Sequence, residues 1–333
     1  MKYRIATYNV ENQRSLYSDG VLVENGRNRY EALANTIAKI QPAIIGIVEG
    51  SNIASDHDHF LRHPKLKGLK YKVAHGKNSR GSQELLFYYR DIFEILSIDD
   101  TIHFYDNWHE DIDNDTIEEY LKFERKPLEV RFRHRESGEQ FLIILVSFKS
   151  KGVFTTTDFY RHEKVSLANR KKLYAQSKKV RERLDQLLEH HPNLPVIVMG
   201  DINDSPGMDH LEKIIGASAV ETIMGNVFHP ERIFHNALWP LAEKLGAKHL
   251  WTIDFHDPIV HNHKKHREWV DHIFISPGLF EGSDTLRFVR NSGDTATRDE
   301  FSKHASDHLP VYCSIEISPE GNKGTHPPNH HIA

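Results

Sequence analysis

Short apolar runs, each about as long as a β-strand, recur along the chain and constrain its fold more than any other feature. They occupy residues 5–9, 43–48, 85–89, 128–132, 141–146, 196–199, 270–275 and 311–317. Runs that are apolar at almost every position are typical of strands buried on both faces. A few helical stretches lie between them, the clearest at 30–40 and 164–190. Many strands with few helices predict an α+β fold, in which two packed sheets carry helices on their outer faces.

One domain is expected over residues 1–318, followed by a disordered tail at 319–333. The 333 residues include 38% hydrophobic and 27% charged residues, which fits a soluble protein with an adequate core. No repeat or long linker divides the chain, and no apolar run reaches the length of a membrane-spanning helix. The amino terminus reads as a strand from Lys2, and the single cysteine, Cys313, excludes an internal disulfide framework. These features predict a cytoplasmic protein without a secretory leader or a membrane contact.

The charge pattern limits how the chain could meet nucleic acid. A net charge of -4 argues against a protein that coats nucleic acid, although an enzyme could still bind a few phosphates locally. The stretch 164–190 is rich in Lys and Arg, which we interpret as a solvated outer face rather than as a track for a phosphate backbone. The acidic stretch 111–115 resembles the start of a calcium loop, but Lys122 stands where such a loop needs a bidentate Glu. We therefore interpret it as a surface loop.

Two polar motifs adjoin apolar runs that are far apart in the chain. Gly-Asp-Ile-Asn at 200–203 follows one run, and Ser-Asp-His at 306–308 precedes another. A buried strand that ends in carboxylate, amide or imidazole groups brings them to the edge of a sheet. There they can hold a divalent cation and a water molecule, which the hydrolysis of a phosphate ester requires.

Four further polar residues stand beside or inside apolar runs. They are Asn9 and Glu49 at the ends of the first two runs, Arg125 just before the fourth and Asp271 inside the seventh. Taken alone, Glu49 is explained by a salt bridge or a helix cap as well as by metal binding, and Arg125 by a surface ion pair. An aspartate within a buried strand is costly unless it is paired or hydrogen-bonded, so Asp271 indicates a buried partner.

Taken in order, these motifs resemble the endonuclease/exonuclease/phosphatase superfamily, which includes deoxyribonuclease I, apurinic endonucleases, neutral sphingomyelinases and inositol-polyphosphate phosphatases. The family's elements follow one another here across residues 5–317. They are Thr7-Tyr8-Asn9, Glu49, Arg125-Lys126-Pro127-Leu128, the motif at 200–203, Asp271 and the motif at 306–308. The resemblance implies a four-layer α/β/β/α sandwich of the deoxyribonuclease I type, which agrees with the strand-rich pattern.

The resemblance also implies four catalytic residues. Asp201 would orient and deprotonate the attacking water, and Asn203 would hold that water or a phosphoryl oxygen. His308 would lie against the phosphate and stabilise the charge of the transition state. Asp271 would accept a hydrogen bond from the other nitrogen of His308, which fixes its tautomer and favours the imidazolium.

Metal and substrate would be bound by further polar residues. Glu49 is the best metal-ligand candidate, and Asp307 and Asn9 would help directly or through water. A few carboxylates and an amide suit Mg²⁺, with Mn²⁺ as an alternative. The candidate substrate-binding residues are Asn9, Arg125, Ser147 and Lys149.

One part of the site departs from the family's pattern. Many relatives carry a histidine after the middle strand, where this chain has Ser147. In the deoxyribonuclease I branch that histidine pairs with a glutamate, and the matching residue here is Gln83, or Glu84 if the match slips by one residue. This departure puts the second acid/base pair in doubt, although apurinic endonucleases also lack the histidine and remain active. Ser147 itself is explained equally well as a donor to phosphate and as packing at a strand edge.

The histidine-rich stretch 256–267 has two interpretations. A zinc site would need a third or fourth ligand within reach. We favour a loop that borders the cleft, with some of its basic side chains touching substrate phosphates.

These observations favour a metal-dependent phosphoesterase that hydrolyses phosphodiester bonds, as a nuclease on DNA or RNA. The motif at 200–203 continues as Asp204-Ser205-Pro206, a form that resembles bacterial nuclease-like members, whereas inositol-polyphosphate phosphatases usually continue with Tyr-Arg. The alternatives are a phosphatase of a small phosphorylated metabolite or inositol phosphate, and a family member that has lost catalysis and acts as a scaffold. No obligate protein partner is implied. Endo- or exo-action and the oligomeric state stay open.

Overall fold

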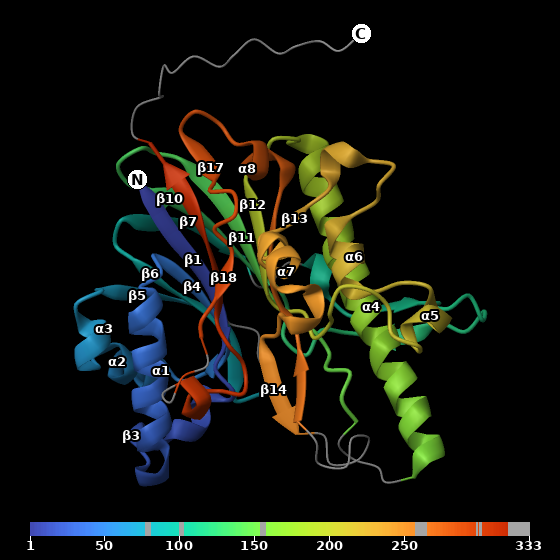
Figure 1. Ribbon diagram of the computed structural model, residues 1–333, viewed down its shortest axis with the longest axis horizontal. Helices are drawn as coiled ribbons and strands as arrows, with labels where there is room; N and C mark the ends of the chain where they lie inside the picture. The colour runs from blue at the N-terminus through green and yellow to red at the C-terminus, as the bar shows by residue number, and fades with distance from the viewer. Residues whose placement is uncertain are drawn as a thin grey trace.

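The structure, a computed structural model, describes residues 1–76, 81–99, 103–153, 158–256, 265–297, 299 and 302–318. In this part of the chain two β-sheets lie face to face, and helices cover the outer face of each sheet (Figure 1). The predicted α+β sandwich is therefore confirmed. The predicted tail, 319–333, and the middle of the histidine-rich stretch, 257–264, lie outside the described residues.

Each sheet is built around a parallel pair of strands, and its other neighbours are antiparallel. The first sheet has the order β17 (Leu286–Phe288), β19 (Val311–Ile317), β1 (Lys2–Asn9), β4 (Ile44–Ser51), β6 (Gln83–Arg90), β5 (Tyr71–His75), and β18 (Asp294–Thr295) also pairs with β19. The second has the order β13 (His235–Asn236), β16 (Asp271–Ile275), β12 (Val196–Asp201), β11 (Gln140–Ser147), β10 (Leu128–His134), β7 (Phe93–Asp99). Each of the eight predicted strands lies in one of these two sheets.

Helices flank the sheets on opposite sides (Figure 1). The first sheet is covered by α1 (Arg27–Ile40), α2 (Ala54–Leu61) and α3 (Pro64–Lys67), and the second by α4 (Phe159–His190) and α6 (Ala219–Met224). The other α-helices of the described residues are α5 (Glu212–Ile215), α7 (Trp239–Leu245) and α8 (Pro277–Glu281). Three hairpins stand apart from the main sheets: β2 (Tyr17–Ser18) with β3 (Val21–Leu22), β8 (Trp108–Glu110) with β9 (Glu119–Leu121), and β14 (Ile253–His256) with β15 (Lys265–Glu268). The two predicted helices are α1 and α4, which both begin earlier than expected.

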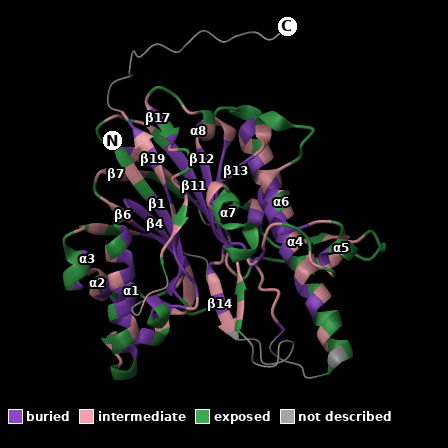
Figure 2. Cartoon of the chain, viewed as in Figure 1, coloured by how far each residue is buried: buried purple, intermediate pink, exposed green. Residues whose placement is uncertain are grey.

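The layers explain why the strands are apolar at consecutive positions. In β4, Ile44 and Val48 belong to the core between the two sheets, whereas Ile45 and Ile47 belong to the core under α1. Buried residues accordingly run along the strands, while the outer faces of the helices are exposed (Figure 2). Each fully buried side chain of this kind contributes about 1.5–3 kcal/mol, so both faces of the strand stabilise the sandwich.

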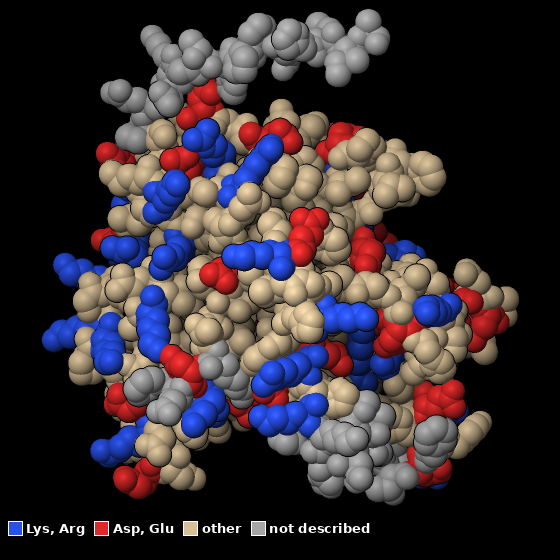
Figure 3. Space-filling view, viewed as in Figure 1, with Lys and Arg blue, Asp and Glu red and all other residues tan. Residues whose placement is uncertain are grey.

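The basic face of α4 is only in part the solvated surface that the sequence analysis expected: Lys164 and Lys172 are exposed, but other basic side chains are paired. Lys171 pairs with Asp113 at 2.7 Å, and Arg183 pairs with Glu129 at 3.1 Å. Lys178 pairs with Glu110. These basic side chains therefore dock acidic segments onto α4, so they are not available as a track for phosphates either. On the face shown in Figure 3, acidic and basic side chains of the described residues are interspersed.

The acidic stretch 111–115 forms the expected loop. The Asp111 carboxylate accepts hydrogen bonds from the backbone N–H groups of Asp115 at 3.1 Å and Thr116 at 2.8 Å, which closes the turn.

None of the helices in the described part of the chain combines the length and the apolar character needed to span a bilayer.

Candidate active site

The strand directions bring the predicted site residues to one edge of the sandwich. At this edge β1, β4, β11 and β12 end, while β6, β10, β16 and β19, which run antiparallel to them, begin. A residue at the end of the first group and a residue at the start of the second therefore become neighbours. The polar residues placed in this way are Asn9, Glu49, Gln83, Arg125, Ser147, Asp201, Asp271, Asp307 and His308.

Gly200 determines how the chain reaches Asp201 at the end of β12. Its φ is 143°, and a Cβ atom there would lie 1.9 Å from the carbonyl oxygen of Val146 on β11. Only glycine fits, because the obstacle is the backbone of a paired strand. Two residues after Asp201, Asn203 has a φ of 55° and donates its backbone N–H to Asp201 Oδ1 at 3.0 Å. The Gly-Asp-Ile-Asn motif thus encodes a turn that orients the Asp201 carboxylate.

The Asp201 carboxylate is buried where the two sheets meet. Asn9, at the end of β1, donates its side-chain N–H to Asp201 Oδ2 at 3.0 Å, and its own Oδ1 accepts the N–H of Glu11 at 3.0 Å. The pKa of Asp201 is raised to about 7, chiefly because burial disfavours the charged form. The charge of His308 opposes this effect and that of Asp271 adds to it. The carboxylate is therefore suited to accept a proton near neutral pH.

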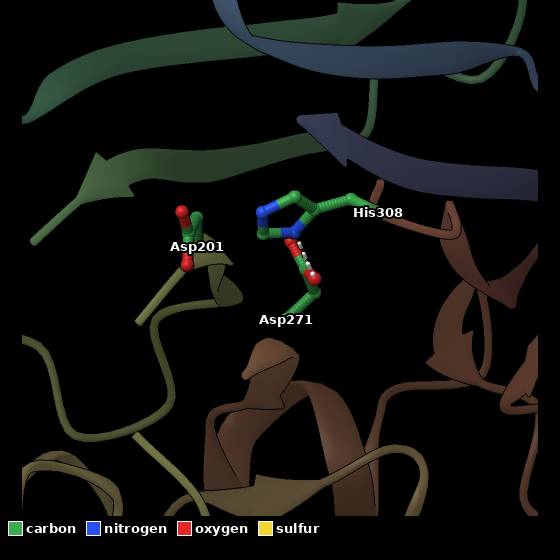
Figure 4. Close-up of side chains that lie close together, drawn as sticks. All are labelled: Asp201, Asp271 and His308. Carbon is green, nitrogen blue, oxygen red and sulfur yellow. Dashed lines mark hydrogen bonds and ion pairs between the residues drawn. The ribbon is translucent and has the colours of Figure 1, made fainter. Parts of the chain in front are cut away.

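Asp271 and His308 form a buried pair, in the contact that the resemblance implied (Figure 4). His308 Nδ1 lies 2.8 Å from Asp271 Oδ2, and the imidazole ring lies between Asp271 and Asp201. Burial would lower the pKa of His308, but the charge and hydrogen bond of Asp271, with Asp201 and Asp307, outweigh it and raise the pKa to about 10. The surrounding carboxylates therefore favour the imidazolium form of His308.

Thr252 ties this pair to the hairpin of β14 and β15. Its Oγ1 accepts the backbone N–H groups of Val270 and Asp271, each at 3.0 Å, and its carbonyl oxygen accepts the N–H of Leu309 at 2.6 Å. One buried residue thus joins the segments that carry Asp271 and His308. The sequence analysis missed Thr252, because a lone threonine outside any motif gives no signal.

Glu49 lies at an irregularity of β4. Its φ is 62°, and the pairing of β4 with β6 shifts in register at this point. Glu49 Oε2 accepts the backbone N–H of Asn12 at 3.0 Å and the side-chain N–H of Gln83 at 2.9 Å. Its Oε1 lies 3.9 Å from Nη2 of Arg125. Two hydrogen bonds thus fix Oε2 and orient the carboxylate. A carboxylate oriented in this way fits a ligand of Mg²⁺ or Mn²⁺, with Oε1 as the atom that would bind the ion.

Arg125 occupies the space between Gln83 and Ser147. Its Nη1 donates to Gln83 Oε1 at 2.6 Å, and its Nη2 donates to Ser147 Oγ at 3.0 Å. Gln83, rather than Glu84, is thus the residue that faces the site. Ser147 acts as an acceptor for arginine, a role that neither interpretation of the sequence had given it.

The site opens into a cleft of about 1570 Å³. The cleft reaches from Asn9, Asp307 and His308 across Lys149 to β14 and the segment 205–212. Lys149 is fixed through its backbone, whose N–H donates to Gln176 of α4 at 2.7 Å. The histidine-rich stretch 256–267 was expected to border the cleft. Ile253 to Phe255 and Glu268, on either side of it, line the cleft, but its described residues, 256 and 265–267, do not.

A buried ion cluster that the sequence analysis missed lies in the far wall of the cleft. Lys151 contacts Asp204 and lies 2.5 Å from Glu212 Oε1. Burial and the charge of Asp204 raise the pKa of Glu212 to about 7, and Lys151 opposes them. The only signal for Asp204 in the sequence was its position directly after the motif at 200–203. The cluster could not be predicted, because its members come together only in the folded chain.

Two groups of acidic or imidazole side chains in the described residues could hold a metal by geometry, with ligand atoms within 4.8 Å. One is Asp201, Asp271 and His308, and the other is Asp111, Asp113 and Asp115. In the second group Asp113 is already paired with Lys171. The structure therefore brings the predicted catalytic residues together, and Glu49 and Asp307 line the same cleft without belonging to the tight group.

The fold and the polar residues at one edge place the chain in a class of proteins in which two packed sheets carry a site at the ends of their strands. The family described as "Endonuclease/Exonuclease/phosphatase family" matches residues 6–308. The chain belongs to this family, whose members are typically metal-dependent phosphoester hydrolases. No curated protein matches it in sequence.

Solved structures with the same fold are distant in sequence. The catalytic domain of human Nocturnin with a bound sulfate is 16% identical, with a TM-score of 0.53 and coverage of 95% of this chain and 94% of that one. TDP2 from C. elegans is 14% identical, with a TM-score of 0.55 and coverage of 96% and 76%. An endonuclease/exonuclease/phosphatase from Bacteroides vulgatus is 16% identical, with a TM-score of 0.53 and coverage of 96% and 100%. At these identities the likeness shows the fold alone.

Proposed function

We propose that the chain is a divalent-metal-dependent phosphoesterase that hydrolyses phosphodiester bonds, acting as a nuclease on DNA or RNA. One observation carries the proposal: Asp201, Asp271 and His308 are buried together, with ligand atoms within 4.8 Å, at the edge where the cleft opens. Burying two carboxylates side by side is costly, and a protein that only binds a partner gains nothing from it. This cost argues against a catalytically inactive scaffold.

The side chains divide the work of the reaction. Asp201, with its raised pKa, orients the attacking water and takes its proton, and Asn203 holds the water or a phosphoryl oxygen. His308, charged through Asp271, stabilises the negative charge that develops on the phosphoryl group. Arg125 binds a non-bridging oxygen through its guanidinium fork.

Glu49 is the proposed metal ligand, with Asp307 assisting. His308 is less suited, because a protonated imidazole has no free lone pair on either nitrogen. Asn9 uses its amide to orient Asp201, so its part in metal binding is through water. When bound, Mg²⁺ or Mn²⁺ would polarise the phosphoryl oxygens.

Two observations bear on the substrate. TDP2 from D. rerio, a protein with this fold, has been solved with a single-strand DNA product, which supports a nucleic acid substrate. A second candidate, a small phosphorylated metabolite, is favoured by the charge of the cleft. Among the described residues its lining holds nine carboxylates against four Lys or Arg side chains, which disfavours a long polyanion.

A substrate panel tests the proposal. It contains labelled single- and double-stranded DNA, RNA, inositol phosphates and bis-p-nitrophenyl phosphate, each with Mg²⁺, Mn²⁺ or EDTA. We expect cleavage of a nucleic acid that stops in EDTA and falls by several orders of magnitude in Asp201→Asn. Asp19→Asn, at an exposed turn, serves as the control. Turnover confined to inositol phosphates would favour the second candidate, and metal binding without any turnover would favour a scaffold.

A further inference from the structure

Gln83 joins the proposed metal ligand to the proposed phosphate ligand. Its Nε2 donates to Glu49 Oε2 at 2.9 Å, and its Oε1 accepts from Arg125 Nη1 at 2.6 Å. A carboxylate can only accept and a guanidinium can only donate. An amide, with one donor end and one acceptor end, is therefore the side chain that satisfies both neighbours at once.

Ser147 completes the support of Arg125 from the other sheet. Its Oγ accepts from Arg125 Nη2 at 3.0 Å. Gln83 begins β6 in the first sheet and Ser147 ends β11 in the second, so the guanidinium is held by one acceptor from each sheet. Of the other three N–H groups, the one on Nε is buried and has no hydrogen-bond partner among the described residues.

Both acceptors are neutral, and this has an electrostatic consequence. A carboxylate at position 83 would form an ion pair with Arg125 and would repel Glu49, which lies within hydrogen-bond distance. The amide and the hydroxyl orient the guanidinium without adding a negative charge to that of Glu49, whose Oε1 lies 3.9 Å from Arg125 Nη2. Arg125 can therefore attract an anion that enters the cleft more strongly than it could beside a second carboxylate.

We propose that Gln83 is a positioning residue that fixes Glu49 and Arg125 relative to each other, and that Ser147 positions Arg125 alone. This inference rests on the proposed function, because it assigns the cation to Glu49 and a phosphate oxygen to Arg125. Gln83 would then hold the metal ligand Glu49 and the phosphate ligand Arg125 next to each other at the edge of the cleft.

Three variants separate the two links. Gln83→Met removes both hydrogen bonds at similar size. Gln83→Glu keeps an acceptor for Arg125 but places a like charge beside Glu49. Ser147→Ala removes one support of Arg125 and leaves Glu49 untouched. For each variant, calorimetry gives the Kd of Mn²⁺ and, at saturating Mn²⁺, the Kd of inorganic phosphate, and kinetics give kcat and KM for bis-p-nitrophenyl phosphate.

The expected pattern differs between variants. Gln83→Met weakens the binding of both Mn²⁺ and phosphate, each by about tenfold, as is typical when a residue that orients a metal ligand is lost. Gln83→Glu tightens the binding of Mn²⁺, because it adds a carboxylate beside Glu49. It weakens the binding of phosphate, because the new carboxylate neutralises Arg125. Ser147→Ala weakens phosphate and raises KM by about tenfold, and it changes the Kd of Mn²⁺ by less than about twofold. Opposite shifts in Gln83→Glu exclude a general loss of structure.

Gln140→Met is the matched control, since Gln140 is exposed at the opposite end of β11 from Ser147. It should leave all the constants unchanged. Unchanged binding of both ions in Gln83→Met, or parallel shifts of both ions in Gln83→Glu, would overturn the inference. Both binding measurements work without turnover, so they still test Gln83 if the wild-type protein cleaves nothing in the substrate panel.

Discussion

Asp271 favours the charged form of His308 through its own charge and a hydrogen bond, and Asp271→Asn removes this support while keeping the shape. The amide can also turn an N–H toward Nδ1, which favours the wrong tautomer. We expect kcat for bis-p-nitrophenyl phosphate to fall on the order of 10³–10⁴-fold, as for other aspartate–histidine pairs. KM and the melting temperature should change little. A kcat within tenfold of the wild-type value would show that the imidazolium is not required.

His57 gives the protein a pH-dependent stability. Its Nδ1 lies 2.7 Å from the Tyr88 hydroxyl and its Nε2 lies 2.7 Å from the Ser51 carbonyl oxygen. Burial lowers the pKa of His57 from 6.5 to about 4, with His75 adding to the effect, although the Ser51 carbonyl and the nearby Asp56 oppose it. Between these two values the unfolded chain binds a proton and the folded chain does not. The free energy of unfolding therefore falls by up to roughly 3 kcal/mol as the pH falls from about 6.5 to 4. Below pH 4 His57 causes no further loss.

Urea unfolding at pH 7.5, 5.5 and 4.5 checks this expectation. His57→Gln should flatten the fall in the free energy of unfolding between pH 6.5 and 4. His103→Gln should not, because that side chain is 99% exposed. Equal pH profiles for wild type and His57→Gln would contradict the assignment.

At the scale of the element, the end of β12 depends on Gly200. Gly200→Ala would place Cβ 1.9 Å from a backbone oxygen of β11 at a φ of 143°, and neither strand can move away without breaking the sheet. We expect a loss of more than about 4 kcal/mol in the free energy of unfolding, or a failure to fold. Gly138→Ala is the control, since Gly138 has a φ of 77° but nothing within 4 Å, and should cost about 1–2 kcal/mol. Similar losses for the two would show that the close contact with β11 is unimportant.

At the scale of the whole molecule, metal binding should stabilise the fold. A cation that binds the folded chain alone adds about 2.7 kcal/mol at 100 times its Kd. We expect Mn²⁺ to raise the melting temperature by several degrees in calorimetric scans, EDTA to reverse the rise, and Glu49→Ala to abolish it. Glu136→Ala, at an exposed turn, should keep the full response. A full response in Glu49→Ala would place the metal elsewhere.

The sequence identified eight strands of the two main sheets and the polar residues at their ends, because local apolar runs and short motifs encode both. It predicted the contact of Asp271 with His308 only through the family resemblance. It misjudged part of α4, where Lys178 and Arg183 looked solvated because their acidic partners, Glu110 and Glu129, lie far away in the chain. Thr252 and the Lys151 cluster stayed hidden for the same reason.

What the sequence by itself determined is the set of chemical groups and the strand that each one adjoins. Only the tertiary structure decided which groups meet. Gln83 and Ser147 come from different sheets, yet both hold Arg125, and an irregularity in β4 decides which way Glu49 points. The physical reason is that apolar burial is a local and repeated signal, whereas hydrogen bonds of this kind depend on the packing of two sheets and on distances of a few tenths of an ångström.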